Sequence, residues 1–278
     1  MTKFSLIQLN TGCDPKKSFE VLKKFIVKAA SGGSKFICTP ETTNIMEVRN
    51  SLLFKKIYSE KEDIYLEKIL KLTKDLNIWL NLGSWILKDK NNKAVNRTIL
   101  INPDGLIHAR YDKIHLFDVE ISKKEKYLES KTYNSGNKAV VTNTPFGSLG
   151  LTICYDLRFP YLYRDLAMSG AEIIFVPSAF TYDTGKVHWH SLLKARAIET
   201  GSYVIAAAQK GTHENKRKTY GHSLVIDPWG KVIAEKNNGI GVMDFDIDLK
   251  RVKIARSKIP SINAVSYTHL TLPTNREV

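Results

Sequence analysis

The chain has 278 residues, which is long enough for one large domain with a substantial core. Its hydrophobic content of 43% and charged content of 25% are ordinary for a globular protein, and no apolar stretch approaches the roughly 20 residues that a membrane-spanning helix needs. The 3 cysteines are too few and odd in number for a disulfide framework. We therefore expect a cytoplasmic protein with no membrane partner.

The formal net charge of +14 raises the question of nucleic-acid binding. The lysines are spread along expected helices, as at Lys16, Lys23 and Lys68, and do not form one basic tract interleaved with aromatic residues. Short clusters such as Lys216–Lys218 are expected in loops. We interpret most of the lysines as solvated helix faces and expect no nucleic-acid partner, while attraction of an anionic substrate stays open as a use of the charge.

In chain order, the first half begins with a strand within Met1–Asn10, whose apolar part is too short for a signal peptide. The apolar spacing over Lys16–Ala30 predicts an amphipathic helix, which leads to a strand over Phe36–Thr39. Farther along, the residues Asn102–Gly105 predict the turn of a β-hairpin.

The second half repeats this order of elements. A buried strand leads to Cys154, a helix is expected over Tyr161–Ser169, and a strand follows over Ile173–Val176. The segment Asp227–Gly230 matches the earlier hairpin turn. Two halves with the same order predict an α/β (α+β) protein in which two similar sheets pack face to face with helices outside, a four-layer α-β-β-α sandwich of two pseudo-symmetric halves.

No linker interrupts this pattern, so we expect one domain over residues 1–265. Residues 266–278 differ in character, because they are polar and threonine-rich and show neither a helical nor a strand period. We interpret residues 266–278 as a non-native or disordered tail and exclude them from the fold.

Three strand ends carry residues that suit hydrolysis of an amide through a thioester. Glu41 and Cys154 each follow a short apolar run, and Lys113 ends a strand-like stretch among apolar and aromatic neighbours. In this chemistry a thiol must lose a proton, the carbonyl oxygen must be stabilised as it gains charge, and the departing amine must be protonated. Each residue alone has an ordinary explanation, as a helix-start acid, a solvated lysine or a buried core cysteine. Together they favour a catalytic site.

At these residues the chain resembles the nitrilase superfamily of carbon–nitrogen hydrolases, from about Phe4 to Val265. The segments that resemble the three catalytic segments of the superfamily are Pro40-Glu41, Lys113–Asp118 and Cys154–Pro160. Within the superfamily the chain is most similar to the branch that contains deaminated-glutathione amidase and ω-amidase. The segments that support this branch are Pro177–Phe180, His188-Trp189, Ala195–Thr200, Tyr220–Ser223 and Asp227–Gly230.

The resemblance implies a role for each catalytic residue. Cys154 would be the nucleophile, with its thiolate favoured by the nearby lysine cation and by the start of the following helix, and Glu41 would be the general base. Lys113 would stabilise the oxyanion together with the backbone N–H of Tyr155. Glu129 matches a second glutamate that orders the lysine and the substrate amide, although it could equally be a loop carboxylate. Because side chains fill every role, we expect no metal or organic cofactor.

The resemblance also implies a substrate with a short acyl chain that carries an α-keto acid or peptide carboxylate. Arg158 could bind that carboxylate bidentately, or it could form a structural ion pair with Asp156 or Glu199. Three further residues are expected to contact the ligand or wall the pocket: Phe117, Phe180 and Thr184.

The sequence thus predicts a thiol-dependent amidohydrolase that cleaves a small carboxylate-bearing amide and releases ammonia or an amine. Deaminated glutathione is the preferred substrate and α-ketoglutaramate the alternative, and the enzyme is expected to be a homodimer or a higher homo-oligomer. A metal-dependent phosphoesterase and a catalytically silent binding protein are the rival readings. The phosphoesterase would need clustered Asp, Asn and His at strand ends. His188 and His190 lie two residues apart, so they point to different faces of a helix, and His222 is expected to be structural.

Overall fold

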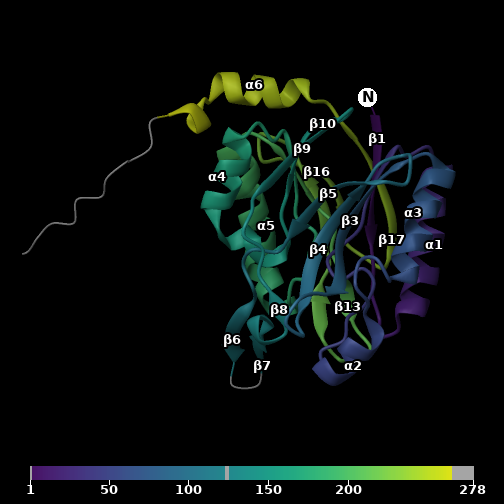
Figure 1. Ribbon diagram of the computed structural model, residues 1–278. Helices are drawn as coiled ribbons and strands as arrows, with labels where there is room; N and C mark the ends of the chain where they lie inside the picture. Colours follow the sequence, from purple (N-terminus) through teal and green to yellow (C-terminus); the bar gives the residue numbers. More distant parts are fainter. Residues whose placement is uncertain (1, 123–124, 265–278) are drawn as a thin grey trace, which may run out of the picture.

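The structure is a computed structural model that describes residues 2–122 and 125–264. The expected tail at residues 266–278 lies outside the described residues. Two sheets form the centre of the molecule, with α1 and α3 on one side and α4 and α5 on the other (Figure 1). This is the four-layer sandwich that the repeated order of elements predicts, and the prediction is confirmed.

The first half of the chain contains β1 (Thr2–Gln8), α1 (Pro15–Ser31), β2 (Phe36–Cys38), α2 (Asn50–Lys56), α3 (Ile64–Leu76), β3 (Trp79–Lys88), β4 (Ala94–Ile101) and β5 (Ile107–Asp112). A middle segment contains β6 (Asp118–Ser122), β7 (Glu125–Leu128), the short 3-10 helix η1 (Glu129–Lys131) and β8 (Tyr133–Asn134).

The second half contains β9 (Val140–Thr144), β10 (Gly147–Leu151), the 3-10 helix η2 (Cys154–Arg158), α4 (Pro160–Met168), β11 (Ile173–Phe175), α5 (Tyr182–Thr200), β12 (Tyr203–Ala206), β13 (Lys210–Thr212), β14 (Lys218–Tyr220), β15 (Ser223–Ile226) and β16 (Val232–Lys236). The last described elements are β17 (Gly241–Ile247), α6 (Lys250–Lys258) and η3 (Ser261–Asn263). No helix in the described part of the chain is long and apolar enough to cross a membrane.

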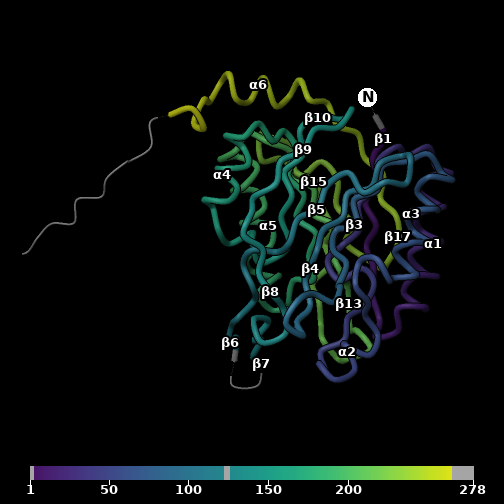
Figure 2. The backbone as a smooth tube through the Cα atoms, in the orientation of Figure 1, coloured from purple at the N-terminus to yellow at the C-terminus, as the bar shows by residue number. Residues whose placement is uncertain are grey.

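The two sheets have the same internal topology. In the first, β1, β2 and β3 are parallel, and β3, β4 and β5 are antiparallel neighbours. In the second, β10, β11 and β12 are parallel, and β12, β15 and β16 are antiparallel neighbours. One antiparallel strand extends each sheet, β17 beside β1 and β9 beside β10 (Figure 2). Both predicted hairpin turns join antiparallel strands.

Local sequence accounts for the helices that cover the sheets. The α1 helix begins after Asp14, whose carboxylate accepts from the backbone N–H groups of Lys16 and Lys17, and Pro15 occupies its first turn. Its buried side chains recur three or four residues apart, at Phe19, Leu22, Ile26 and Ala29. This apolar stripe packs against the first sheet.

Aromatic side chains join the inner faces of the two sheets. Phe36 of β2 stacks on Phe175 of β11, with ring centroids 5.5 Å apart and ring planes 5° apart. Phe4 of β1 packs edge-on against Phe146 at 5.5 Å. All of these rings belong to, or pack against, one apolar core that spans both sheets. The sheets are therefore held at a fixed separation, which places their strand ends opposite one another.

Candidate active site

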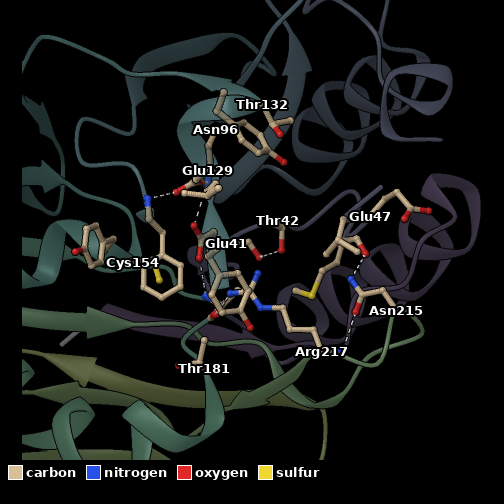
Figure 3. A pocket seen from close by; sticks show the side chains of 18 of the residues that line it. Glu41, Thr42, Glu47, Asn96, Glu129, Thr132, Cys154, Thr181, Asn215 and Arg217 are labelled. Carbon is tan, nitrogen blue, oxygen red and sulfur yellow. Dashed lines mark hydrogen bonds between the residues drawn. The ribbon is translucent and has the colours of Figure 1, made fainter. Parts of the chain in front are cut away.

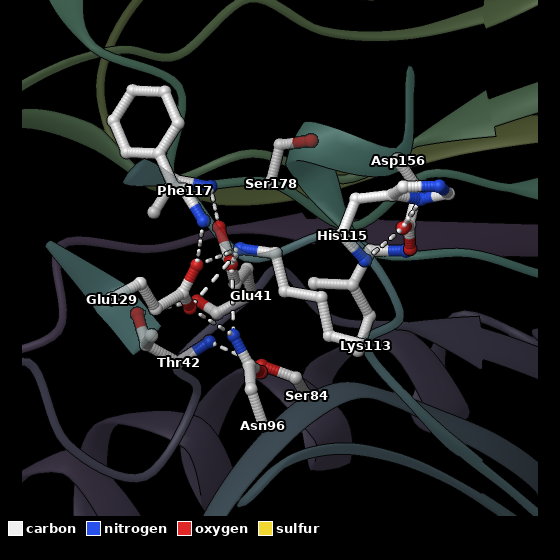
Figure 4. Close-up of polar contacts among 12 residues, drawn as sticks. Glu41, Thr42, Ser84, Asn96, Lys113, His115, Phe117, Glu129, Asp156 and Ser178 are labelled. Carbon is white, nitrogen blue, oxygen red and sulfur yellow. Dashed lines mark hydrogen bonds and ion pairs between the residues drawn. The ribbon is translucent and has the colours of Figure 1, made fainter. Parts of the chain in front are cut away.

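Glu41, Lys113 and Cys154 lie together in one buried pocket. Each follows a strand, β2, β5 and β10 respectively, and their exposed fractions are 4%, 2% and 7%. Lys113 Nζ lies 3.0 Å from Glu41 Oε1 and 2.9 Å from Glu129 Oε2 (Figure 4). The structure thus brings together the acid, the cation and the thiol that the sequence singled out, with the second glutamate beside them.

The carboxylate of Glu41 is fixed by donors from several elements. Asn96 Nδ2 donates to Oε1 at 3.0 Å, and the backbone N–H of Ala179 donates to Oε2 at 2.7 Å. Burial raises the pKa of Glu41, but the positive charges of Lys113 and Arg217 outweigh burial and hold the pKa below its usual value. Glu41 is therefore ionised at neutral pH and able to accept a proton.

A bulge in β3 supports the turn that carries Glu41. The register with β4 shifts between Leu82 and Trp85. Within the bulge, the Ser84 side chain accepts from the backbone N–H of Thr42 at 2.7 Å, and the Ser84 backbone N–H donates to the Pro40 carbonyl at 3.1 Å. The turn on both sides of Glu41 is consequently tied to the sheet.

The backbone at Cys154 is strained. β10 ends at Leu151, earlier than the sequence predicts, and Cys154 opens η2 with a φ of +46°, a value that non-glycine residues rarely adopt. Its backbone N–H donates to the Pro177 carbonyl at 3.0 Å. This conformation turns the thiol out of the line of the strand and into the pocket.

The ionisation state of the Cys154 thiol differs from the one expected from the sequence. Burial and the neighbouring Glu41 carboxylate raise its pKa, and the opposing effect of Lys113 is smaller. The resting form is therefore the neutral thiol, not the thiolate that the sequence reading favoured. A protonated thiol beside an ionised carboxylate needs that carboxylate as its base.

Asp156 connects the cysteine segment to the lysine segment. It is fully buried, and its Oδ2 accepts from the backbone N–H of Ile153 at 2.8 Å and from the Tyr111 hydroxyl at 2.6 Å. Its Oδ1 accepts from the backbone N–H of His115 at 3.1 Å and lies 2.7 Å from His115 Nδ1. Sequence reasoning gave Asp156 no such role, although its position two residues after the cysteine was a usable signal.

Glu129 and Tyr155 complete the surroundings of Lys113 and Cys154. Glu129 Oε2, besides contacting Lys113, accepts from the backbone N–H of Phe117 at 2.6 Å, so Glu129 lies inside the site and is not a surface loop carboxylate. Tyr155 is the second residue of η2, where a helical N–H has no partner within the helix. Among the described residues, the Tyr155 N–H makes no hydrogen bond.

Glu41, Lys113 and Cys154 line a cavity of about 470 Å³. Four residues that were expected to meet the substrate line it: Phe117, Arg158, Phe180 and Thr184. Arg158 Nη2 lies 3.2 Å from His188 Nδ1, and its guanidinium carbon lies 5.2 Å from the centre of the Phe180 ring. The alternative of an ion pair with Asp156 or Glu199 is wrong, because Asp156 binds His115 and Glu199 binds Arg196.

Several polar residues that line the cavity were not singled out from the sequence, Asn96 and Thr181 among them. Glu47, Asn215 and Arg217 line it together with the predicted residues (Figure 3). Asn215 and Arg217 lie in the connection between β13 and β14. Of the two, Arg217 belongs to the basic cluster Lys216–Lys218 that was expected in a loop. Nothing local in the sequence shows that this connection folds back over the pocket.

One cluster outside the pocket has the side chains to hold a metal ion. The ligand atoms of His190, His222 and Glu235 lie within 4.8 Å of one another. In the structure both imidazoles bind the same carboxylate oxygen, His190 at 2.9 Å and His222 at 2.8 Å. His188 points elsewhere, toward Arg158, as the spacing of the two helix histidines predicts.

Comparisons with known proteins agree with this geometry. The family model described as carbon-nitrogen hydrolase matches residues 3–257. A deaminated glutathione amidase of Dictyostelium discoideum is 41% identical over 95% of this chain and 93% of its own length. The solved structure of Saccharomyces cerevisiae Nit3, a member of branch 10 of the nitrilase superfamily, superposes with a TM-score of 0.83 at 30% identity, over 93% of this chain and 94% of that one.

The NitFhit protein of Caenorhabditis elegans is also similar, with a TM-score of 0.86 at 37% identity. The match covers 93% of this chain and 63% of that one. Family model, full-length relatives and solved structures all point to the same superfamily that the strand-end residues resemble. The chain belongs to the carbon–nitrogen hydrolase family of the nitrilase superfamily and is an amidohydrolase.

Proposed function

We propose that the enzyme hydrolyses a small carboxylate-bearing amide through a thioester on Cys154. The observation that carries the proposal is the placing of the thiol, the ionised Glu41 carboxylate and the Lys113 ammonium in one pocket. Lys113 is held in its charged form, because the attraction of Glu129 and Glu41 outweighs burial and raises its pKa well above the usual value. The site therefore offers a nucleophile, a base and a fixed cation.

In the first half of the reaction, Glu41 takes the thiol proton as the Cys154 sulfur attacks the amide carbonyl carbon. The carbonyl oxygen gains negative charge, which Lys113 and the Tyr155 N–H stabilise; a donor of this kind is worth about 3–4 kcal/mol. The tetrahedral intermediate then collapses, the carbon–nitrogen bond breaks, and the amine leaves with the proton that Glu41 returns.

In the second half, Glu41 takes a proton from a water molecule that attacks the thioester carbonyl. The same two donors stabilise the second oxyanion. Collapse breaks the carbon–sulfur bond and releases the carboxylic acid, and the proton returns from Glu41 to the Cys154 sulfur. The full cycle consumes one water molecule and returns Glu41 and Cys154 to their starting protonation states.

The best-supported substrate is deaminated glutathione, which is named in the activity of the full-length relatives. Arg158 supports a carboxylate on the acyl part, because its guanidinium lines the cavity and no described carboxylate forms an ion pair with it. α-Ketoglutaramate, which would release ammonia, is the second candidate and would use the same arginine.

The test is release of amine or ammonia from both amides by the wild-type protein and by Cys154→Ala. We expect turnover by the wild type, loss of it in Cys154→Ala, insensitivity to chelators and inactivation by thiol alkylation. Turnover retained in Cys154→Ala would overturn the thioester route. A folded protein that hydrolyses neither amide would favour the silent binding protein, and chelator-sensitive phosphoester cleavage would favour the rival hydrolase.

We also propose that the protein is cytoplasmic and forms a homodimer. The three cysteines Cys13, Cys38 and Cys154 are buried and unpaired, which suits a reducing compartment. For the dimer, support comes from exposed apolar side chains on the outer helices, with Tyr161 on α4 and Val187 on α5 exposed by 80% and 69%.

A further inference from the structure

We propose that Arg217 binds a second carboxylate, one on the amine side of the scissile amide. The preferred substrate would then carry a carboxylate on each side of the bond that is cut, as an acylated amino acid or short peptide with an ionised C-terminus does. This inference rests on the proposed amidase function and names the substrate class of the same site.

The first support is the uncompensated charge of Arg217. Among the described residues its guanidinium makes one hydrogen bond, from Nη2 to the Ala179 carbonyl at 2.6 Å, and no ion pair. Its Nε is buried and has no acceptor. A charged donor left unsatisfied is costly, so the site lacks an acceptor that a ligand carboxylate would supply.

The carboxylates of the cavity cannot supply this acceptor, because each already has cationic partners. Glu41 and Glu129 both bind Lys113. Glu47 binds Lys56 at 3.3 Å and Arg49 at 3.1 Å. Over its whole lining the cavity has five cationic side chains and three carboxylates, namely Lys113, Lys126, Arg158, Lys216 and Arg217 against Glu41, Glu47 and Glu129. Its formal charge is therefore positive, and a substrate carboxylate complements it.

The second support is that hydrogen bonds and a ring contact hold Arg217 in position. Its backbone N–H donates to the Asn215 side chain at 2.9 Å, and its carbonyl accepts from the backbone N–H of His213 at 2.8 Å. Asn215 in turn donates to the Met46 carbonyl at 2.8 Å, and the Tyr127 ring lies 5.2 Å from the guanidinium carbon. A guanidinium held in this way binds a carboxylate with little further loss of entropy.

The position of Arg217 assigns it to the amine side. In Figure 3, Cys154 lies toward one end of the pocket and Asn215 toward the other, with Glu41 and Arg217 between them. Glu41 gives its proton to the departing amine, so the amine portion lies on the Glu41 side of the bond. Arg217 and Glu41 both bind the backbone of Ala179, Arg217 through the Ala179 carbonyl and Glu41 through the Ala179 N–H, whereas Arg158 lies on the cysteine's own helix and serves the acyl portion.

The experiment compares three substrates with the same acyl group. These are deaminated glutathione, the same molecule with its C-terminal carboxylate converted to a primary amide, and α-ketoglutaramate. We expect Arg217→Gln to lower kcat/KM for deaminated glutathione by about 10- to 100-fold, mostly through KM, because a hydrogen bond to a charged group is lost. Loss of the positive charge near Glu41 acts on all three substrates alike, so kcat/KM for the other two should fall by a smaller factor than that for deaminated glutathione.

Lys218→Gln is the matched control, since it removes the neighbouring positive charge from an exposed side chain that does not line the cavity. Lys218→Gln should leave kcat/KM unchanged for all three substrates. Arg217→Lys should recover part of the kcat/KM that Arg217→Gln loses with deaminated glutathione. Equal loss on all three substrates would show that Arg217 acts only through Glu41 and would overturn the inference. The inference would also be overturned if the ratio of kcat/KM for deaminated glutathione to that for its C-terminal amide were the same in Arg217→Gln as in the wild type.

A binding measurement separates this inference from the proposed function. In Cys154→Ala, deaminated glutathione should bind more tightly than its C-terminal amide, and Cys154→Ala with Arg217→Gln should lose that preference. If the wild type turns over neither compound but the preference is present, the proposed function fails and the role of Arg217 stands. If turnover occurs without the preference, the role of Arg217 fails alone.

Discussion

Lys113 is surrounded by two carboxylates, and this arrangement decides which residue acts as the base. Glu41 and Glu129 bring two negative charges and Lys113 brings one positive charge, so the three side chains together carry one net negative charge. Burial penalises each charge, but the mutual attraction is large where water is excluded. The lysine therefore stays protonated, and a carboxylate is left to accept the proton of the thiol.

Replacing either group should abolish most turnover while the fold survives. Glu41→Gln keeps the size of the side chain and removes the general base, which is worth about 10²–10⁴ in rate. Lys113→Ala removes an oxyanion donor and should cost about 10²–10³ in kcat. Steady-state kinetics with deaminated glutathione, beside circular dichroism of each variant, checks this. Full activity in either folded variant would contradict the assignment.

At the scale of elements, the bulge in β3 is a place where the two halves of the chain are in close contact. A Cβ on Gly83 would lie 1.9 Å from the Thr39 carbonyl oxygen and 2.4 Å from Pro177 Cβ. Thr39 precedes the turn of Glu41, and Pro177 accepts from the Cys154 N–H. A glycine at this position lets the backbones that carry the base and the nucleophile meet.

Gly83→Ala should therefore disturb the site as well as the fold. The added methyl group has to displace backbone, so we expect unfolding to become easier by about 1–3 kcal/mol or more. Because the displaced segment carries Glu41, kcat should fall further than the loss of folded protein explains. Thermal unfolding and kinetics at a temperature where the variant is folded measure the two effects. Gly32→Ala, at an exposed helix end remote from the pocket, is the control and should change neither.

The β13–β14 connection should respond to pH through His213. Its ring lies between the Thr11 carbonyl and the Thr219 hydroxyl, is 3% exposed, and has a pKa lowered to about 4, mainly by burial. In the unfolded chain the imidazole has its ordinary pKa of about 6.5. Between about pH 4 and pH 6.5 the unfolded state therefore binds more protons than the folded state. Stability is then lost as pH falls through this window, by about 2 kcal/mol from pH 7 to pH 5.

Urea unfolding at pH 7 and pH 5 measures this loss. His213→Gln, which carries no titrating ring, should lose less stability over the same interval than the wild type by about that amount. An equal loss of unfolding free energy in the two proteins between pH 7 and pH 5 would contradict the assignment of the pH dependence to His213.

The elements could be predicted from the sequence where a pattern is local. The α1 helix was indicated by the spacing of Phe19, Leu22 and Ile26, and the hairpins by their Pro-containing turns. The repeated order of elements in the two halves indicated two similar sheets. The strand ends also predicted the meeting of Glu41, Lys113 and Cys154, since the sites of α/β proteins collect at the carboxyl ends of strands. These signals lie within a few residues of the features that they predict.

Other features depend on partners that are distant in the chain and could not be predicted in this way. The positive φ of Cys154 is maintained by contacts to residues near Pro177, and the bulge at Gly83 is explained by the loop around Thr39. Arg217 reaches the pocket because its hairpin is anchored to Met46 and Thr11 of the other half. The neutral state of the Cys154 thiol follows from burial, which the sequence does not show.

At the scale of the whole molecule, the repeated halves explain why there is one site. Glu41 and Lys113 come from the first half and Cys154 from the second, so neither half holds the complete set. Packing the two sheets face to face brings the strand ends of both halves to the same pocket. The outer helices α4 and α5 are left with faces that no other described element covers fully.

Those outer faces should mediate the proposed dimer. Tyr161 and Met168 are seven residues apart on α4, and Val187 and Ile198 are eleven apart on α5, so each pair lies on one side of its helix. The four side chains are exposed by 56–80%, and α4 packs beside α5 (Figure 1). Adjacent apolar stripes of this kind suit a two-fold contact in which each copy presents the same face.

Placing a charge in the stripes tests this assembly directly. Met168→Glu and Val187→Glu should each convert a dimer to a monomer in size-exclusion chromatography with light scattering, because the contact would bury an unpaired charge in each copy. Leu106→Glu is the matched control, since Leu106 is 64% exposed in the turn between β4 and β5, away from both helices, and should leave the dimer intact. A monomeric wild type, or a dimer that persists in both stripe variants, would mean that copies of this chain do not associate through α4 and α5.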